Sequence, residues 1–268
     1  MNNSRHEKIS KELNLNPAQI AATELLITEG ATIPFIARYR KEATGSLDEV
    51  AVTAIRDRLL QLEELDNRRQ AIIKSLTERN LLTDELNEKI LAAETVSSLE
   101  DIYLPFRPKR RTRATIAREK GLEPLALRIF TQEDMDIEAE AAPFVDAEKG
   151  VASAEEALAG ARDIIAEWIN EDQDARTRIR NLFFEKGTSR SRVLPEKEAA
   201  GIKYKDYYDW EEPVSSAPSH RVLAMRRGER EEFLMLRIAP PEEEALAILE
   251  SIFIRGSNEA SMQVKTAV

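Results

Sequence analysis

Apolar residues recur at spacings of three and four along most of the chain, which is the pattern of amphipathic helices. The longest such stripe predicts one long helix from about residue 47 to residue 80 and consists of Ile55, Leu59, Leu62, Leu65, Ile72, Ile73 and Leu76. Asp66 and Arg69 interrupt this stripe. The preceding Ser46-Leu47-Asp48-Glu49 matches a capping box, in which the serine oxygen accepts a backbone amide. Clean heptads are too few for a dimeric coiled coil, so we interpret the helix as an arm packed along its own molecule.

Start and stop signals divide the rest of the chain into shorter elements. A helix that begins at Asn16-Pro17 and a short helix over 33–41 form a helix–turn–helix element. A further helix is expected over 196–210, and alternating apolar residues near 230–238 favour a minor strand, with a helix as the alternative. We therefore predict an all-α fold, a multi-helix array with one long helix. We divide it into two helical regions, residues 1–130 and 131–268.

Composition changes this picture mainly through charge. The 268 residues carry 39 Lys and Arg against 49 Asp and Glu, so the formal net charge is −10. The charge is sorted into blocks, with a net +6 over residues 104–130, −12 over 131–175 and +6 over 176–205. No apolar run approaches the ~18 residues that span a bilayer, and no secretory signal follows Met1. We expect a soluble cytoplasmic protein with no membrane partner.

Few residues are suited to catalysis. The chain has no cysteine, which excludes disulfides, thiolate metal sites and a cysteine nucleophile. The two histidines, His6 and His220, stand far apart, and His6 is expected to be solvated near the chain end. No glycine-rich phosphate loop is present, and the carboxylates fall at solvent-face spacing. We expect no catalytic residue, no metal, no cofactor and no enzymatic activity.

Two basic segments are candidates for nucleic-acid contact. The first follows Phe106 and holds Arg107, Lys109, Arg110, Arg111 and Arg113, which are five of the seven residues from 107 to 113. Prolines keep this segment extended, arginine forks suit phosphate, and the ring of Phe106 offers a face on which a base can stack. The second segment, in the helix–turn–helix element, contributes Arg38, Arg40 and Lys41. Two alternatives stay open for the first segment: ion pairing with the acidic 131–175 block, or docking of another domain.

Several strings resemble the bacterial Tex proteins, the transcription accessory proteins. They run from Ile33 to Gly45, from Leu99 to Arg113 and from Ala117 to Leu125, and a further block comprises Ser219-His220-Arg221 and Arg227-Gly228-Glu229. The resemblance implies a mostly helical N-terminal part, cut off before a nuclease-like domain, helix-hairpin-helix motifs and an S1 RNA-binding domain.

The resemblance also implies a function and partners. We expect a nucleic-acid-binding transcription accessory protein that takes RNA or single-stranded DNA mainly through domains absent here, with this chain as its helical scaffold. RNA polymerase and ribosome-associated factors are the expected protein partners. The alternative is a protein-interaction scaffold that docks RNA polymerase or other domains without direct nucleic-acid contact.

Overall fold

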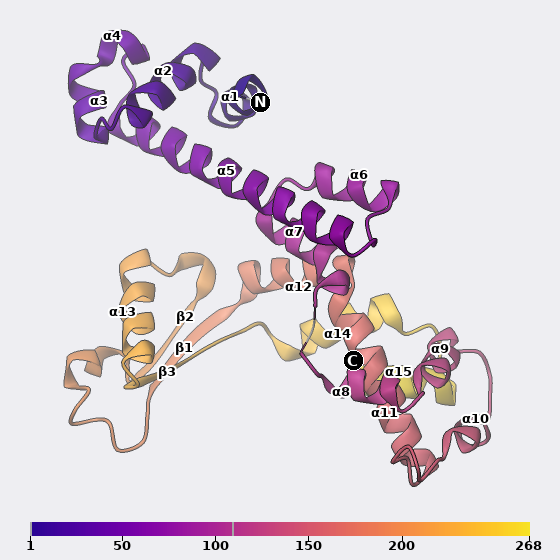
Figure 1. Ribbon diagram of the computed structural model, residues 1–268. Helices are drawn as coiled ribbons and strands as arrows, with labels where there is room; N and C mark the ends of the chain where they lie inside the picture. Colours follow the sequence, from indigo (N-terminus) through magenta and orange to yellow (C-terminus); the bar gives the residue numbers. More distant parts are fainter. Residues whose placement is uncertain (1, 109) are drawn as a thin grey trace. The chain divides into compact units, whose positions relative to one another are not determined.

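The chain folds into two compact units. The computed structural model describes residues 2–108 and 110–268, with side chains from residue 5 onward. The first unit ends at Phe106 and the second spans Arg107–Val268 (Figure 1). The sequence-based division falls between residues 130 and 131, whereas the contacts divide the chain at Phe106. The difference arises because the two helices between 113 and 131 pack against a long helix of the second unit.

The first unit is helical throughout its described part. Its elements are α1 (Asn2–Leu13), α2 (Pro17–Thr28), α3 (Ile33–Tyr39), α4 (Lys41–Thr44), α5 (Glu49–Glu78), α6 (Asp84–Ala92), α7 (Val96–Tyr103) and the 3-10 turn η1 (Leu104–Phe106). The 30-residue helix α5 confirms the predicted long helix, and α2 and α3 form the predicted helix–turn–helix pair.

The predicted cap of the long helix is wrong by two residues. Asp48, not Ser46, caps α5, and its carboxylate accepts a hydrogen bond from the amide of Ala51 at 2.8 Å. Ser46 adopts left-handed backbone with φ 66°, and its amide donates to the carbonyl of Lys41 at 2.7 Å. Ser46 therefore closes the end of α4 and is not placed to begin α5.

Helix α5 passes through two separate apolar cores. Figure 1 shows α1–α4 near its first half and α6 and α7 near its second half. Its first half packs with α1, α2 and α3 around Ile9, Ile20, Ile36, Leu47, Val52, Ile55 and Leu62. Its second half packs with α6 and α7 around Leu65, Ile72, Leu76, Leu86, Ile90, Leu99, Ile102 and Tyr103. Each core buries several fully covered aliphatic side chains, and each such burial contributes about 1.5–3 kcal/mol.

The two charged residues that interrupt the stripe connect neighbouring elements. Asp66 accepts hydrogen bonds from Arg5 on α1 at 2.9 Å and from Arg69 at 2.5 Å. Arg69 also donates to the carbonyls of Ile90 at 3.2 Å and Ala93 at 2.9 Å, at the end of α6. These polar groups therefore satisfy one another and the exposed carbonyls of a helix end.

His6 does not lie in solvent as expected. It is 8% exposed, and its Nε2 lies 2.6 Å from Oε2 of Glu24. Helix α1 packs against α2, which brings this histidine of the first turns onto the neighbouring helix.

The second unit combines helices with a small sheet. Its helices are α8 (Arg113–Glu119), α9 (Glu123–Thr131), α10 (Ile137–Ala141), α11 (Ala154–Glu171), α12 (Gln173–Lys186), α13 (Ser219–Arg230), α14 (Glu242–Phe253) and α15 (Glu259–Ala267), with 3-10 turns η2 (Ala142–Phe144), η3 (Ile202–Tyr207) and η4 (Val214–Ser216). Helix α11 is central to its main core, where α8, α9 and α15 surround Ala157, Ala161, Ile164 and Ile165. None of the helices described in either unit is long and apolar enough to cross a membrane.

The sheet is antiparallel with the strand order β2-β1-β3 (Figure 1). Its strands are β1 (Thr188–Val193), β2 (Asp209–Pro213) and β3 (Leu234–Ala239). Strand β3 confirms the minor strand predicted near 230–238. The helix predicted over 196–210 is wrong, because this stretch contains only η3 and the start of β2. Helix α13 packs against β3, and Gly228 permits the close approach, since an added Cβ would lie 2.5 Å from Cδ1 of Leu234.

Gln132 ties the end of α9 to residues more than a hundred positions away. This buried side chain donates from Nε2 to the carbonyl of Phe253 at 2.7 Å and accepts from the amide of Arg255 at 2.9 Å. Its own carbonyl accepts from Nδ2 of Asn258 at 2.9 Å, and Asn258 also caps α15. One glutamine therefore joins three helix ends.

We expect Gln132→Ala to lower the free energy of unfolding by about 1–3 kcal/mol, because one buried and one partly buried backbone group lose their hydrogen bonds. Urea denaturation followed by circular dichroism measures this loss. The control is Gln173→Ala, the same change at the exposed first residue of α12, which should stay within about 0.5 kcal/mol of the unsubstituted chain. Equal stabilities of the two variants would contradict the role given to Gln132.

Candidate nucleic-acid interface

The basic loop 107–113 leaves two of its arginines free of internal partners. Arg107 and Arg110 are exposed, and neither forms an ion pair with any residue of 2–108 or 110–268. Arg111 is held by Glu119, with Nη2 at 2.8 Å from Oε2. Lys109, another member of the predicted set, lies outside the described residues.

The other end of the loop is tied to the acidic block. Thr112 caps α8 by accepting from the amide of Thr115, and its hydroxyl donates to Glu167 of α11 at 3.1 Å. Arg113 lies with Nε at 3.4 Å from Oδ1 of Asp163, one turn earlier on α11. The ion pairing that the sequence left open as an alternative is thus present for Arg113 and absent, within the described part of the chain, for Arg107 and Arg110.

Arg118, just beyond the loop, forms ion pairs within the second unit. Its guanidinium lies 2.6 Å from Glu167 and 3.1 Å from Glu123. Burial by itself would lower the pKa of Arg118, but the hydrogen bonds to Glu167 and Glu123 outweigh it and raise the pKa above its usual value. A cation held between two carboxylates is poorly placed to contact phosphate as well.

The ring of Phe106 is not as open as the stacking expectation assumed. It is half-buried and packs against the second core of the first unit. The carbonyl of the same residue accepts a hydrogen bond from Nη1 of Arg79, at the end of α5. Phe106 therefore anchors the start of the loop, with part of its ring covered.

The three cations predicted in the helix–turn–helix element gather at one corner of the first unit, where α3 meets α4. This corner, residues 35–41, carries Arg38, Arg40 and Lys41, all exposed. Arg38 lies 3.4 Å from Glu49, and the guanidinium of Arg40 lies 5.3 Å from the ring centroid of Phe35. None of the described residues forms an ion pair with Lys41.

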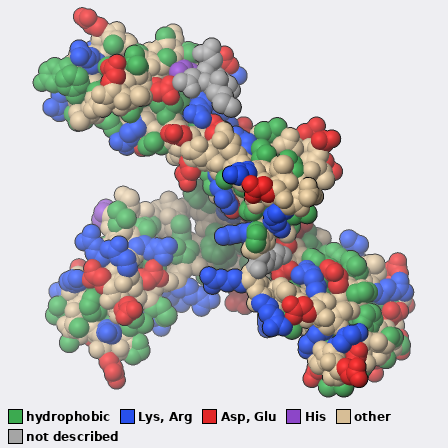
Figure 2. Space-filling model, viewed as in Figure 1, with side chains coloured by type: hydrophobic (Ala, Val, Ile, Leu, Met, Phe, Trp, Pro, Cys, Tyr) green, Lys and Arg blue, Asp and Glu red, His purple; other side chains and the backbone are tan. Residues whose placement is uncertain are grey.

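Sequence reasoning missed the two aromatic residues of this corner. Phe35 and Tyr39 are exposed, and their ring centroids lie 5.5 Å apart. The signal that identifies them is their spacing of four positions on a helix whose buried residues, Ile36 and Ala37, lie on the opposite face. In Figure 2 hydrophobic and basic side chains lie next to each other at the end of the first unit that carries α3 and α4.

The corner is held in place by Gln19. Its Nε2 donates to the carbonyls of Thr44 at 3.0 Å and Gly45 at 3.2 Å, and its Oε1 accepts from the amide of Asn16. Gly45 closes α4 with φ +66°, and a Cβ there would lie 2.7 Å from Nε2 of Gln19. One side chain thus completes the capping box of α2 and fixes the end of α4.

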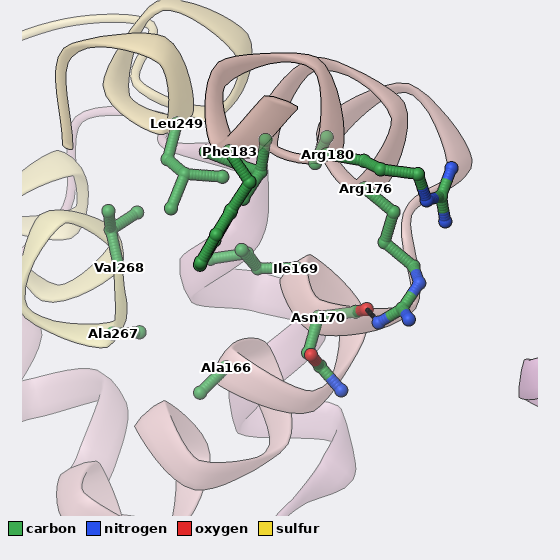
Figure 3. A pocket seen from close by; sticks show the side chains of 11 residues that line it. Ala166, Ile169, Asn170, Arg176, Arg180, Phe183, Leu249, Ala267 and Val268 are labelled. Carbon is green, nitrogen blue, oxygen red and sulfur yellow. Dashed lines mark hydrogen bonds between the residues drawn. The ribbon is translucent and has the colours of Figure 1, made fainter. Parts of the chain in front are cut away.

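A separate apolar hollow of about 580 Å³ lies in the second unit (Figure 3). Phe183, Leu249 and Val268 point into it, while Arg176 and Arg180 lie at one side. The guanidinium of Arg176 donates to the carbonyl of Asn170 at 3.1 Å. The hollow has the character of a surface for apolar side chains and lacks a convergent set of titratable groups.

Comparison with known proteins identifies both parts of the chain. Residues 3–77 match the Tex-like protein N-terminal domain, and residues 132–266 match the Tex central region-like family. Protein YhgF of Escherichia coli is 45% identical over 238 residues, which cover 89% of this chain and 31% of that protein. Protein tex of Bordetella pertussis is 45% identical over 231 residues, 86% of this chain and 29% of that protein. The human S1 RNA-binding domain-containing protein 1 is 25% identical over 246 residues, 89% of this chain and 24% of that protein.

These matches define a class of proteins in which a Tex-like N-terminal domain is followed by a Tex central region. The chain belongs to the Tex family. It spans about 30% of the length of these bacterial relatives.

We expect Gln19→Leu to loosen the corner, because three backbone groups lose their partner. The free energy of unfolding should fall by about 1–2 kcal/mol. Hydrogen exchange of the amide of Ser46, which bonds across α4, should accelerate. The control is Gln70→Leu at an exposed position of α5, and unchanged exchange at Ser46 in Gln19→Leu would show that the glutamine does not hold this corner.

Proposed function

We propose that this chain is the helical scaffold of a nucleic-acid-binding transcription accessory protein, and that it performs no catalysis. The observation that carries the proposal is the basic loop, where Arg107 and Arg110 stand exposed without acidic partners among the described residues. Two relatives support it by their names, the Transcriptional accessory protein Tex of Neisseria gonorrhoeae and the human S1 RNA-binding domain-containing protein 1.

The physical basis is electrostatic. An arginine that already pairs with a carboxylate gains little binding free energy from a phosphate, because it must give up one ion pair to form another. Arg107 and Arg110 have no ion pair to give up, and each planar guanidinium can bind two phosphate oxygens. Binding releases counterions from the nucleic acid, so affinity falls with salt in proportion to the number of phosphates contacted. This local charge acts despite the formal net charge of −10.

A protein-interaction scaffold is the second candidate, and the apolar hollow beside Phe183 favours it (Figure 3). In this proposal the chain docks RNA polymerase or other domains of its own protein. Purified RNA polymerase should then be retained by the immobilised chain after nuclease treatment. Loss of the polymerase on nuclease treatment would instead assign the association to RNA.

The loop is tested by titrating the full 268-residue chain with single-stranded RNA at several salt concentrations. We expect the double variant Arg107→Gln, Arg110→Gln to reduce the slope of log affinity against log salt by about 1.4, because each lost phosphate contact removes about 0.7 from the slope. The control is Arg190→Gln, Arg226→Gln, two exposed arginines that are each bonded to a carboxylate, Glu211 and Glu229.

An unchanged slope in the loop variant would remove the loop from the contact surface. A slope that falls equally in the control would show that general charge, and not the free arginines, governs binding. Turnover of RNA or DNA by the rigorously purified chain would contradict the proposal that no catalysis occurs.

A further inference from the structure

The corner formed by α3 and α4 exposes two aromatic rings that its core does not use. Phe35 is 39% exposed and Tyr39 is 70% exposed, while Ile33 and Ile36 pack α3 against the first core. The rings lie with centroids 5.5 Å apart and planes inclined at 41°. Two large rings left side by side in water cost free energy that a flat partner recovers.

Three cations, Arg38, Arg40 and Lys41, neighbour these rings along the chain. The guanidinium of Arg40 lies over the ring of Phe35, 5.3 Å from its centroid, so a third flat group stacks with the two rings. Lys41 follows Arg40 in the chain and has no ion-pair partner in the described part of the chain. Arg38 forms an ion pair with Glu49, with Nη2 at 3.4 Å from Oε1. Exposed rings next to an unpaired cation are chemically complementary to a ligand that carries both flat rings and negatively charged groups.

The surface is also held in one arrangement before any ligand arrives. Thr44 donates from Oγ1 to the carbonyl of Arg40 at 3.1 Å, and Gln19 binds the carbonyls at the end of α4. The backbone that carries Arg40 and Lys41 is therefore fixed relative to α3. A preorganised surface loses less conformational entropy on binding than a flexible one.

We propose that Phe35, Tyr39 and Arg40 form a stacking platform for unpaired bases of single-stranded RNA, with Lys41 beside it to contact the neighbouring phosphate. A paired base within a duplex is covered on both faces by its neighbours, so exposed rings reach only bases that have left a stack. The platform thus selects single strands, whereas a recognition helix in a groove would select duplex. This inference rests on the proposed nucleic-acid function but uses a different set of residues from the basic loop.

The experiment measures binding of the full 268-residue chain to a single-stranded 12-nucleotide RNA that carries 2-aminopurine, and to the same RNA in a duplex. Stacking on an aromatic ring quenches the 2-aminopurine fluorescence. We expect the double variant Phe35→Leu, Tyr39→Leu to lose the quenching and to bind the single strand at least about tenfold more weakly, with the salt slope unchanged because no charge is removed. The control is Phe184→Leu, an equivalent change at a ring on α12 that is 71% exposed, which should leave binding as it is.

Three outcomes separate the possibilities. If the unsubstituted chain binds RNA with a slope that depends on the loop but the platform variant binds equally well, the platform inference fails alone. If the unsubstituted chain binds no RNA, the proposed function fails with it. If the platform variant loses purified RNA polymerase after nuclease treatment while its affinity for RNA is unchanged, the corner is a protein-docking surface and the inference is overturned. Circular dichroism of each variant verifies that it folds.

Discussion

A helix of 30 residues with an apolar stripe along its length is stable in water only where other elements cover that stripe, and α5 imposes this requirement on the whole first unit. Helices α1–α3 cover its first half, and α6 and α7 cover its second half. Asp66 and Arg69 lie within the second half of α5, just after Leu65, and bond to α1 and to the end of α6. Because α3 packs on this core through Ile33 and Ile36, the face that carries Phe35 and Tyr39 remains exposed.

Competition among charges decides which cations remain available for a partner. One third of the residues are charged, and acidic side chains outnumber basic ones, so most arginines near a carboxylate are already bonded. Helix α11 carries part of the acidic block, and its Asp163 and Glu167 form ion pairs with Arg113 and Arg118 of the preceding basic block. Arg107 and Arg110 in the loop, and Lys41 at the corner, have no acidic partner among the described residues. We propose that these three unpaired cations, and not the total charge, determine what the chain binds.

Local signals in the sequence predicted much of the helical part. The regular stripe of α5 and the Asn16-Pro17 start of α2 depend on neighbours within a few residues, so they could be recognised without the fold. Strands β1 and β2 could not be recognised from the sequence. The buried side chains of β1 (Thr188–Val193) are serines, which give no apolar alternation, and β1 and β2 are stabilised by pairing with residues distant in sequence. The candidate site divides in the same way. Its arginines were evident from composition, but the partner of Arg113 lies fifty positions away on another helix, and the exposure of Phe35 and Tyr39 depends on which face of α3 the core uses.

We propose that this chain meets nucleic acid through the flat and positively charged groups that its own fold leaves without acidic partners among the described residues. Photo-crosslinking tests it most directly: single-stranded RNA containing 4-thiouridine is bound to the full chain and irradiated, and the attached peptides are mapped by mass spectrometry. Crosslinks are expected within residues 35–41 and 107–111. Crosslinks confined to the sheet or to the acidic face of α11 would contradict it.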